Sequence, residues 1–292
     1  MRKFGIVVTA ILLVVVLGVM LVSVGVIPIA SHRQPRPRIA SLPHFSHRLE
    51  RSSEHTAEIR PKLSVSTPHG RIEITGAEVE QIEITMLVET SASTLERTQE
   101  LLDQVALDIA TGSRQTLLTV KVPRLASNEM ARADLIILVP QEMELDLDTS
   151  LGDVQVTDLH GSLKVHTSLG TILVRDHQGS AANLRSSLGS VEVVSSAFAE
   201  RFTAVSDLGD VSVSGSLAQH TVLKASLGDV RVHLPAGESY VLDGRVHLGS
   251  IYVGVPFTGQ QTDKRITGTI GEGEQRGTIS ADVSLGSLRL SN

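Results

Sequence analysis

The chain has 292 residues, a net charge of −6 and few aromatic side chains, with no Trp, two Tyr and five Phe. It contains no Cys, which excludes disulfides, thiolate catalysis and Cys-ligated metals. The acidic balance argues against a nucleic-acid ligand, and the scarcity of aromatic residues argues against stacking platforms for bases or sugar rings.

The first 30 residues predict a transmembrane helix. Residues 4–30 carry no charge, and this apolar stretch is longer than the roughly 20 residues that cross a bilayer as a helix. A cleaved signal peptide is the alternative, although its apolar region usually has only about 7–15 residues. We expect residues 4–30 to lie in the lipid bilayer of the cell membrane as a single pass, with the rest of the chain outside the cytoplasm. The count of Arg residues after the segment favours the opposite orientation, so the topology stays open.

Residues 31–61 predict a basic, Pro-containing stalk that begins with the stiff sequence RQPRPR. Residues 62–143 alternate apolar and polar side chains in segments such as LSVSTPHGRIEITG, which is typical of half-buried strands. One helix is expected at residues 94–104, where STLERTQELLDQ combines strong helix formers with a Ser or Thr N-cap. This part is therefore expected to be a β-rich segment with one helix.

From residue 144 onwards the sequence repeats. The tetrapeptide LGDV occurs at 151–154, 208–211 and 227–230, with near copies between and after. Its glycines are Gly152, Gly170, Gly189, Gly209, Gly228, Gly249 and Gly286. Their separations are 18, 19, 20, 19, 21 and 37 residues, and a period of about 20 residues is typical of a solenoid. We expect residues 144–292 to form a β-solenoid with coils of ~18–21 residues, because a single short coil cannot bury enough apolar surface to fold alone.

The tetrapeptide predicts one corner of each coil. Gly allows a positive φ at a tight turn, the preceding Leu is expected to point into the stack, and the Asp, Ser or Thr that follows can bond nearby backbone amides. The alternative is a Ca²⁺ ladder of Asp153, Asp210 and Asp229. Ser or Thr interrupts that series in the other copies, so we expect a structural turn and no metal.

The sequence offers no catalytic or cofactor-binding motif, and we expect neither a catalytic residue nor a cofactor. The chain ends soon after the last tetrapeptide, so the final strand is expected to be an open edge that could pair with a strand of a partner protein. Its candidate contact residues are Leu285, Leu288, Arg289 and Leu290.

The series TSLGDVQV, TSLGTILV, SSLGSVEV and ASLGDVRV, with the closing ISADVSLGSLRL, resembles the bacterial DUF4097 family of adhesin-like β-strand repeat proteins. The segment STPHGRIEITG and the helix TLERTQELLDQ resemble the N-terminal portion of that family. The resemblance covers about residues 62–292 and implies a β-solenoid that usually lacks catalytic residues. Some members are membrane-anchored and are encoded with envelope-stress systems.

These features together predict a non-enzymatic, membrane-anchored β-solenoid that acts as an adhesin-like binding or scaffolding module at the bacterial cell envelope. An accessory component of an envelope-stress response is the first alternative. A polysaccharide-active β-helix enzyme is the second.

Overall fold

The computed structural model describes residues 46–292, apart from the side chains of residues 275 and 276, and shows a mainly β protein. The segment expected to cross the membrane, residues 4–30, lies outside the described residues. Among residues 46–292, no helix has both the length and the apolar character needed to span a bilayer. The expected membrane anchor therefore stays a prediction.

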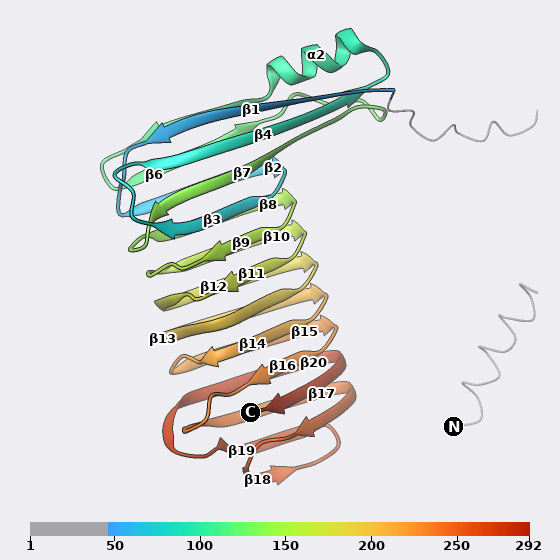
Figure 1. The fold of residues 1–292 in the computed structure, drawn as a ribbon. Coiled ribbons are helices and arrows are strands. Elements are labelled where there is room, and N and C mark those ends of the chain that lie inside the picture. Colours follow the sequence, from blue (N-terminus) through green and yellow to red (C-terminus); the bar gives the residue numbers. More distant parts are fainter. Residues whose placement is uncertain (1–45) are drawn as a thin grey trace, which may run out of the picture. The chain divides into compact units, whose positions relative to one another are not determined.

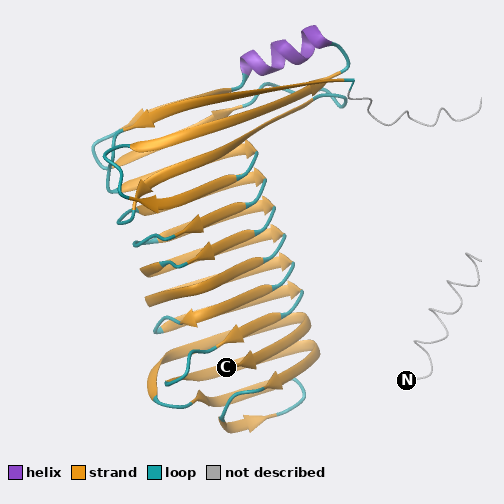
Figure 2. Cartoon of the chain, viewed as in Figure 1, coloured by secondary structure: helices purple, strands orange, loops and turns teal. Residues whose placement is uncertain are grey.

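Three long strands and one helix precede the repeats (Figure 2). They are β1 (His47–Ala57), β4 (Ile82–Ala92), β7 (Met130–Pro140) and α2 (Leu95–Gln104). β4 pairs antiparallel with both β1 and β7, and α2 contacts β4 and β1. The expectation of a stalk over residues 31–61 is wrong where β1 lies. Its polar sequence is compatible with a strand because alternate side chains are exposed.

The predicted helix is confirmed to within one residue at its start. Thr94 is the N-cap, and its Oγ1 accepts a hydrogen bond from the Arg97 backbone N–H at 3.2 Å. Leu101 and Leu102 are buried. The hairpin β5 (Ala106–Thr111) and β6 (Gln115–Lys121) follows the helix.

Each repeat forms one layer of two strands that meet at a glycine. Within residues 144–233 the first layer contains β8 (Glu144–Leu151) and β9 (Val154–Thr157), and the next contains β10 (Leu163–Leu169) and β11 (Ile172–Arg175). The third contains β12 (Gln178–Leu188) and the start of β13 (Val191–Leu208), and the fourth contains the end of β13 and β14 (Val211–Ser216). The layer after these contains β15 (His220–Leu227) and β16 (Val230–His233). An earlier layer of the same kind consists of β2 (Lys62–His69) and β3 (Ile72–Ala77), and it pairs in parallel with β8 and β9.

Consecutive layers pair in parallel, so equivalent residues of different repeats stack on one another (Figure 1). The first strands of the layers form one ladder from β2 to β15, and the second strands form another from β3 to β16. Side chains that point between the ladders make the core. Val154 and Val156, for example, are fully buried and stack on Ile172 and Val174 of the next layer.

The last two layers do not follow the order of the chain. They contain β17 (Glu238–Val253) and β20 (Glu274–Ser291), and the hairpin β18 (Phe257–Gln261) and β19 (Arg265–Gly271) connects them. β20 pairs in parallel with β15 and β16 on one side and with β17 on the other. The final strand of the sequence is therefore inserted between two layers. The long interval from Gly249 to Gly286 arises because the β18–β19 hairpin lies between them.

Candidate binding surfaces

All seven predicted corner glycines have a positive φ, between 143° and 155°. This confirms the prediction of a special backbone conformation at these positions. The structure adds Gly70, with φ 137°, as the corner of the first layer. It was missed because His69 replaces the Leu of the tetrapeptide, although the sequence PHGRI carries the same glycine and following apolar residue.

Glycine is required at the corner for two reasons, the positive φ and the close contact between layers. A Cβ on Gly209 would overlap the carbonyl oxygen of Gly189 in the preceding layer. The same carbonyl oxygen accepts a hydrogen bond from the buried hydroxyl of Ser206 at 2.8 Å. The corner carbonyl of one layer is thus satisfied by a hydroxyl of the next, as buried polar groups must be.

The aspartates of the tetrapeptide bond backbone amides of the neighbouring layer. Oδ1 of Asp210 accepts from the Asp229 N–H at 2.8 Å, and Oδ1 of Asp229 accepts from the Ser287 N–H at 2.8 Å. Burial opposes ionisation of Asp210, but the bonds from the Asp229 amide and from Arg231 outweigh it and lower the pKa of this carboxyl. Residues 46–292 contain no group of three side chains placed to hold a metal ion.

The leucine before each glycine points outward, so the expectation that it lies inside the stack is wrong. These leucines are between 42 % and 62 % exposed: Leu151, Leu169, Leu188, Leu208, Leu227, Leu248 and Leu285. Strict alternation would have placed Leu169 inside, two positions after buried Thr167. The chain already turns into the corner at that point, and the Thr167 hydroxyl occupies the inside by donating to the Gly152 carbonyl at 3.1 Å.

The expected open edge at the C-terminal strand is also wrong. Leu285, Leu288, Arg289 and Leu290 pair with β15 and β16 on one side and with β17 on the other. Leu288 and Leu290 are buried. Arg289 lies over the Tyr252 ring at 5.1 Å. Because β20 is inserted, these residues offer no free edge for strand pairing.

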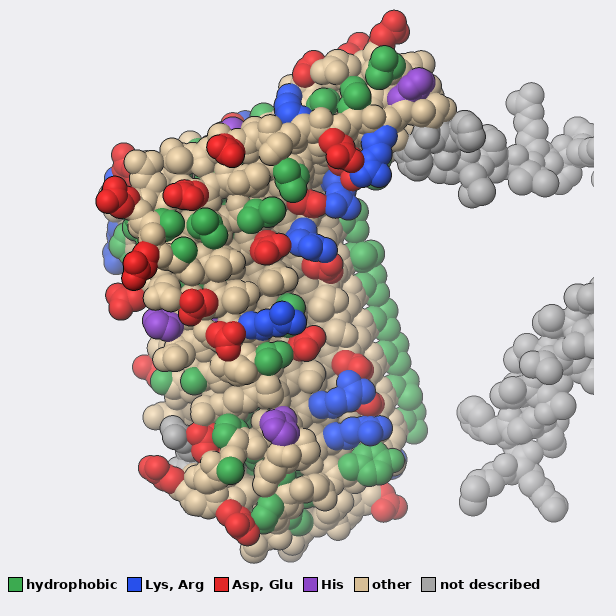
Figure 3. Space-filling view, in the orientation of Figure 1, with side chains coloured by type: hydrophobic (Ala, Val, Ile, Leu, Met, Phe, Trp, Pro, Cys, Tyr) green, Lys and Arg blue, Asp and Glu red, His purple; other side chains and the backbone are tan. Residues whose placement is uncertain are grey.

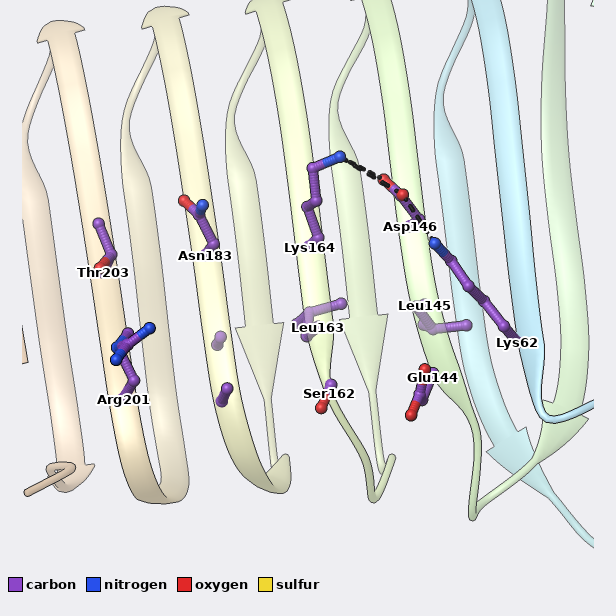
Figure 4. Close-up of a pocket in the computed structure, with 12 residues that line it drawn as sticks. Lys62, Glu144, Leu145, Asp146, Ser162, Leu163, Lys164, Asn183, Arg201 and Thr203 are labelled. Atoms are coloured by element: carbon purple, nitrogen blue, oxygen red, sulfur yellow. Dashed lines mark hydrogen bonds and ion pairs between the residues drawn. The ribbon is translucent and has the colours of Figure 1, made fainter. Parts of the chain in front are cut away.

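A shallow depression of about 330 Å³ lies on the outer face of the first ladder, over β8, β10, β12 and β13 (Figure 4). Its charged lining consists of Lys62, Lys164 and Arg201, which come from different layers, and of Glu144 and Asp146 of β8. Small or short side chains line the space between them: Ser162, Ala181, Asn183 and Thr203. The parallel register brings these side chains together although up to about 140 positions separate them in the sequence.

The charges of this depression are only partly paired. Asp146 lies between the two lysines, with its oxygens 3.0 Å from Lys62 Nζ and 3.2 Å from Lys164 Nζ. Burial raises the pKa of Asp146, but the bonds from Lys62 and Lys164 outweigh it, so the net shift is downward. Arg201 is exposed and forms no ion pair or side-chain hydrogen bond with any described residue. Such a site can hold an anionic group at Arg201 and polar groups along Asn183 and Thr203.

Sequence reasoning missed this depression. Its residues are ordinary outward positions of strands, and none belongs to the tetrapeptide. The pairing of Lys164 with Asp146 and Asn183 follows from the spacing of the repeats, so aligning the repeats by their glycines could have revealed the column.

Comparison with known proteins supports the repeat assignment. The Toastrack DUF4097 family model matches residues 143–284, so residues 62–142, expected to resemble the family as well, lie outside the match. A search of the curated proteins returns no match.

Several solved structures are similar to the chain. A candidate adhesin of Bacteroides fragilis has 12% sequence identity and a TM-score of 0.50, over 83% of this chain and 97% of that one. A candidate adhesin and a candidate lipid-binding protein of Parabacteroides distasonis both have a TM-score of 0.41. The adhesin is 12% identical over 80% of this chain and 97% of that one. The lipid-binding protein is 11% identical over 82% and 96%.

At such low identity the likeness to the Bacteroides fragilis protein concerns the fold alone, and it agrees with a mainly β chain. The match of the family model to the repeats is the stronger finding. Residues 143–284 match the Toastrack DUF4097 family model, as the resemblance of the repeats predicts.

Proposed function

We propose that this chain is a non-enzymatic, adhesin-like binding or scaffolding module of the bacterial cell envelope. In this proposal residues 144–292 form a β-solenoid and residues 4–30 hold the protein in the cell membrane. The family match and the adhesin-like fold relative support a binding role. The parallel pairing of equivalent strands supports the solenoid.

The depression around Lys62, Lys164 and Arg201 is the observation that carries the binding role. It combines an unpaired guanidinium with hydroxyl and amide side chains on a rigid sheet. A guanidinium recognises carboxylate or phosphate groups, and hydroxyl and amide side chains recognise sugar hydroxyls. We therefore propose that the ligand is an anionic glycan or polyol phosphate of the envelope.

The test uses the full chain in lipid nanodiscs with three polymers: a polyuronate, its neutral methyl ester and a poly(glycerol phosphate). We expect binding of one or both anionic polymers and at least tenfold weaker binding of the ester. Arg201→Ala should weaken binding about tenfold, because a charge-assisted hydrogen bond is worth about 1.5–3 kcal/mol. Arg175→Ala is the matched control. Arg175 is also exposed and has no described partner, but it lies on the second ladder.

Equal affinity of all three polymers, or equal effects of the two Arg variants, would contradict the proposal. Release of new reducing ends from the polyuronate would instead favour the alternative of a polysaccharide-active enzyme. If the chain binds neither anionic polymer but does bind a membrane protein, the result would favour the envelope-stress alternative.

A further inference from the structure

The outward leucines form one continuous column along an edge of the stack, visible as the file of hydrophobic side chains in Figure 3. Each leucine is the direct register partner of the next. The column runs through Leu151, Leu169, Leu188, Leu208, Leu227, Leu285 and Leu248. Because β20 is inserted, Leu285 stands before Leu248 and the column has no gap.

The column is large for a surface feature. Neighbouring strands are about 4.8 Å apart, so its seven leucines extend over about 29 Å. With side chains that are roughly half exposed, they present on the order of 600 Å² of apolar surface, which is at the upper end for the largest patch of a typical monomer. A stable protein interface needs about 800 Å² from each partner, and the residues beside the column can supply the difference.

The flanks of the column allow another protein to approach closely. Gly follows every leucine, and Ser precedes five of the seven. Asp207 and His247 are the two exceptions. Small uncharged flanks mean that a partner can cover the leucines with few desolvated charges, which are costly to bury.

The aspartates farther out are already bonded within the protein. Asp210 and Asp229 lie 2.6 Å and 2.8 Å from the guanidinium of Arg231, and Asp153 accepts a hydrogen bond from the Thr171 N–H. A column of identical side chains with a constant repeat has the shape that a second identical column fits, because each leucine of one copy can pack against a leucine of the other, as in the interfaces of stacked sheets.

We propose that the leucine column is the contact surface for a second copy of this chain, which packs its own column against it around a twofold axis. Such an interface is isologous, since the same patch contributes from both copies. In an antiparallel arrangement, full coverage of both columns places Leu208, the fourth of seven, at the axis. In a parallel arrangement every leucine faces its equivalent.

The chain contains no natural cysteine, so single cysteines can report the contact in the full protein in its membrane. Leu208→Cys, Leu151→Cys and Leu87→Cys are oxidised in separate samples, and the disulfide-linked dimer is quantified. Leu87 is the matched control, since it is 40 % exposed on β4, away from the column. We expect Leu208→Cys to give at least fivefold more dimer than Leu87→Cys. Dimer from Leu151→Cys as well shows the parallel arrangement, and its absence shows the antiparallel one.

A second substitution distinguishes a specific contact between the columns from crosslinking by random collision. In the Leu208→Cys protein, adding Leu188→Asp should reduce the dimer at least fivefold, whereas adding Leu87→Asp should leave it unchanged. The proposal is overturned if Leu208→Cys crosslinks no better than the control. It is likewise overturned if the column cysteines do not crosslink and react with a water-soluble maleimide only when lipid is absent. That result would show that the column lies against the bilayer.

Discussion

The layers of residues 144–233 and the layers of residues 238–291 are built from the same kind of repeat but are stacked in different orders. In the first region each new repeat is added to the end of the stack, so chain order and spatial order agree. In the second region β20 enters between β15 and β17, although all three carry the same leucine–glycine corner. A repeat therefore specifies the shape of a layer, while its place in the stack depends on which neighbours fit its two faces.

The largest effect should come from a charge placed in the inserted layer. Leu288 is fully buried and lies between Val230 and Ile251. We expect Leu288→Asp to lower the free energy of unfolding by about 4–5 kcal/mol, because it removes a buried apolar side chain and buries an unpaired carboxylate. Urea unfolding of the full chain measures the loss.

Leu285→Asp is the control on the same strand. Leu285 is 46 % exposed, so its substitution should change the free energy of unfolding by less than about 1 kcal/mol in dilute protein. Similar small losses for both variants would mean that β20 lies at the end of the stack and is covered on one side only.

A corner of the regular region should be the next most sensitive site. Gly209→Ala puts a Cβ at φ 147° and against the Gly189 carbonyl oxygen. We expect a loss of about 3 kcal/mol, from roughly 1–2 kcal/mol of backbone strain and a further 1–3 kcal/mol of overpacking. Gly112→Ala, in the β5–β6 hairpin, should cost much less, since its nearest neighbour would lie 3.5 Å from the new Cβ. An unchanged midpoint of urea unfolding for Gly209→Ala would show that the close packing of the layers does not require glycine at this corner.

The regular region should also respond to acid through His177. This side chain is buried, its Nε2 lies 3.1 Å from the Gly161 carbonyl, and its Nδ1 has no partner among the described residues. Burial lowers the pKa of His177 to about 4 from its usual 6.5. The unfolded chain therefore binds a proton that the folded chain does not between pH 6.5 and 4, so stability falls as the pH falls through this window.

The expected loss between pH 7 and pH 4 is about 3 kcal/mol from this group. Urea unfolding at a series of pH values should show a steeper decline for the natural protein than for His177→Asn. His220→Asn, at an exposed position, should leave the slope unchanged. Parallel pH profiles for all three proteins would mean that folding does not lower the pKa of His177.

The smallest effect is expected from metal removal. The corner aspartates already accept backbone amide bonds, as Asp153 does from the Thr171 N–H at 2.8 Å. We expect EDTA, with or without added Ca²⁺, to leave the melting temperature of the full chain unchanged. A fall of several degrees that Ca²⁺ restores, and that Asp229→Asn abolishes, would show that a cation joins the corners.

The repeating part of the fold could be predicted because it depends on local chemistry. The glycine positions required only a backbone argument, and the alternation along each strand accounts for buried residues such as Val154 and Leu163. The outward orientation of the leucines could not be predicted from alternation. Alternation holds along a strand, whereas Leu169 stands where the strand ends and the chain changes direction.

The remaining errors concern contacts between distant segments. β1 has a polar sequence and becomes a strand because β4 offers a partner over its full length. The order of β20 and β17 depends on which layer fits against β15, and both carry nearly the same motif. The depression at Lys62, Lys164 and Arg201 likewise exists only once the layers are in register. No single segment carries the information that brings these residues together.

The inserted strand also constrains the time at which the stack can be completed. During synthesis, each layer up to β15 and β16 can join its predecessor as soon as it is made. β17 is made before β20, yet it rests on β20 in the finished protein. Until β20 has been synthesised, β17 can pair with β19 but lacks the parallel partner that it has in the finished protein. The layer of β17 can therefore join the stack only together with β20 or after it, a dependence that the layers before it do not have.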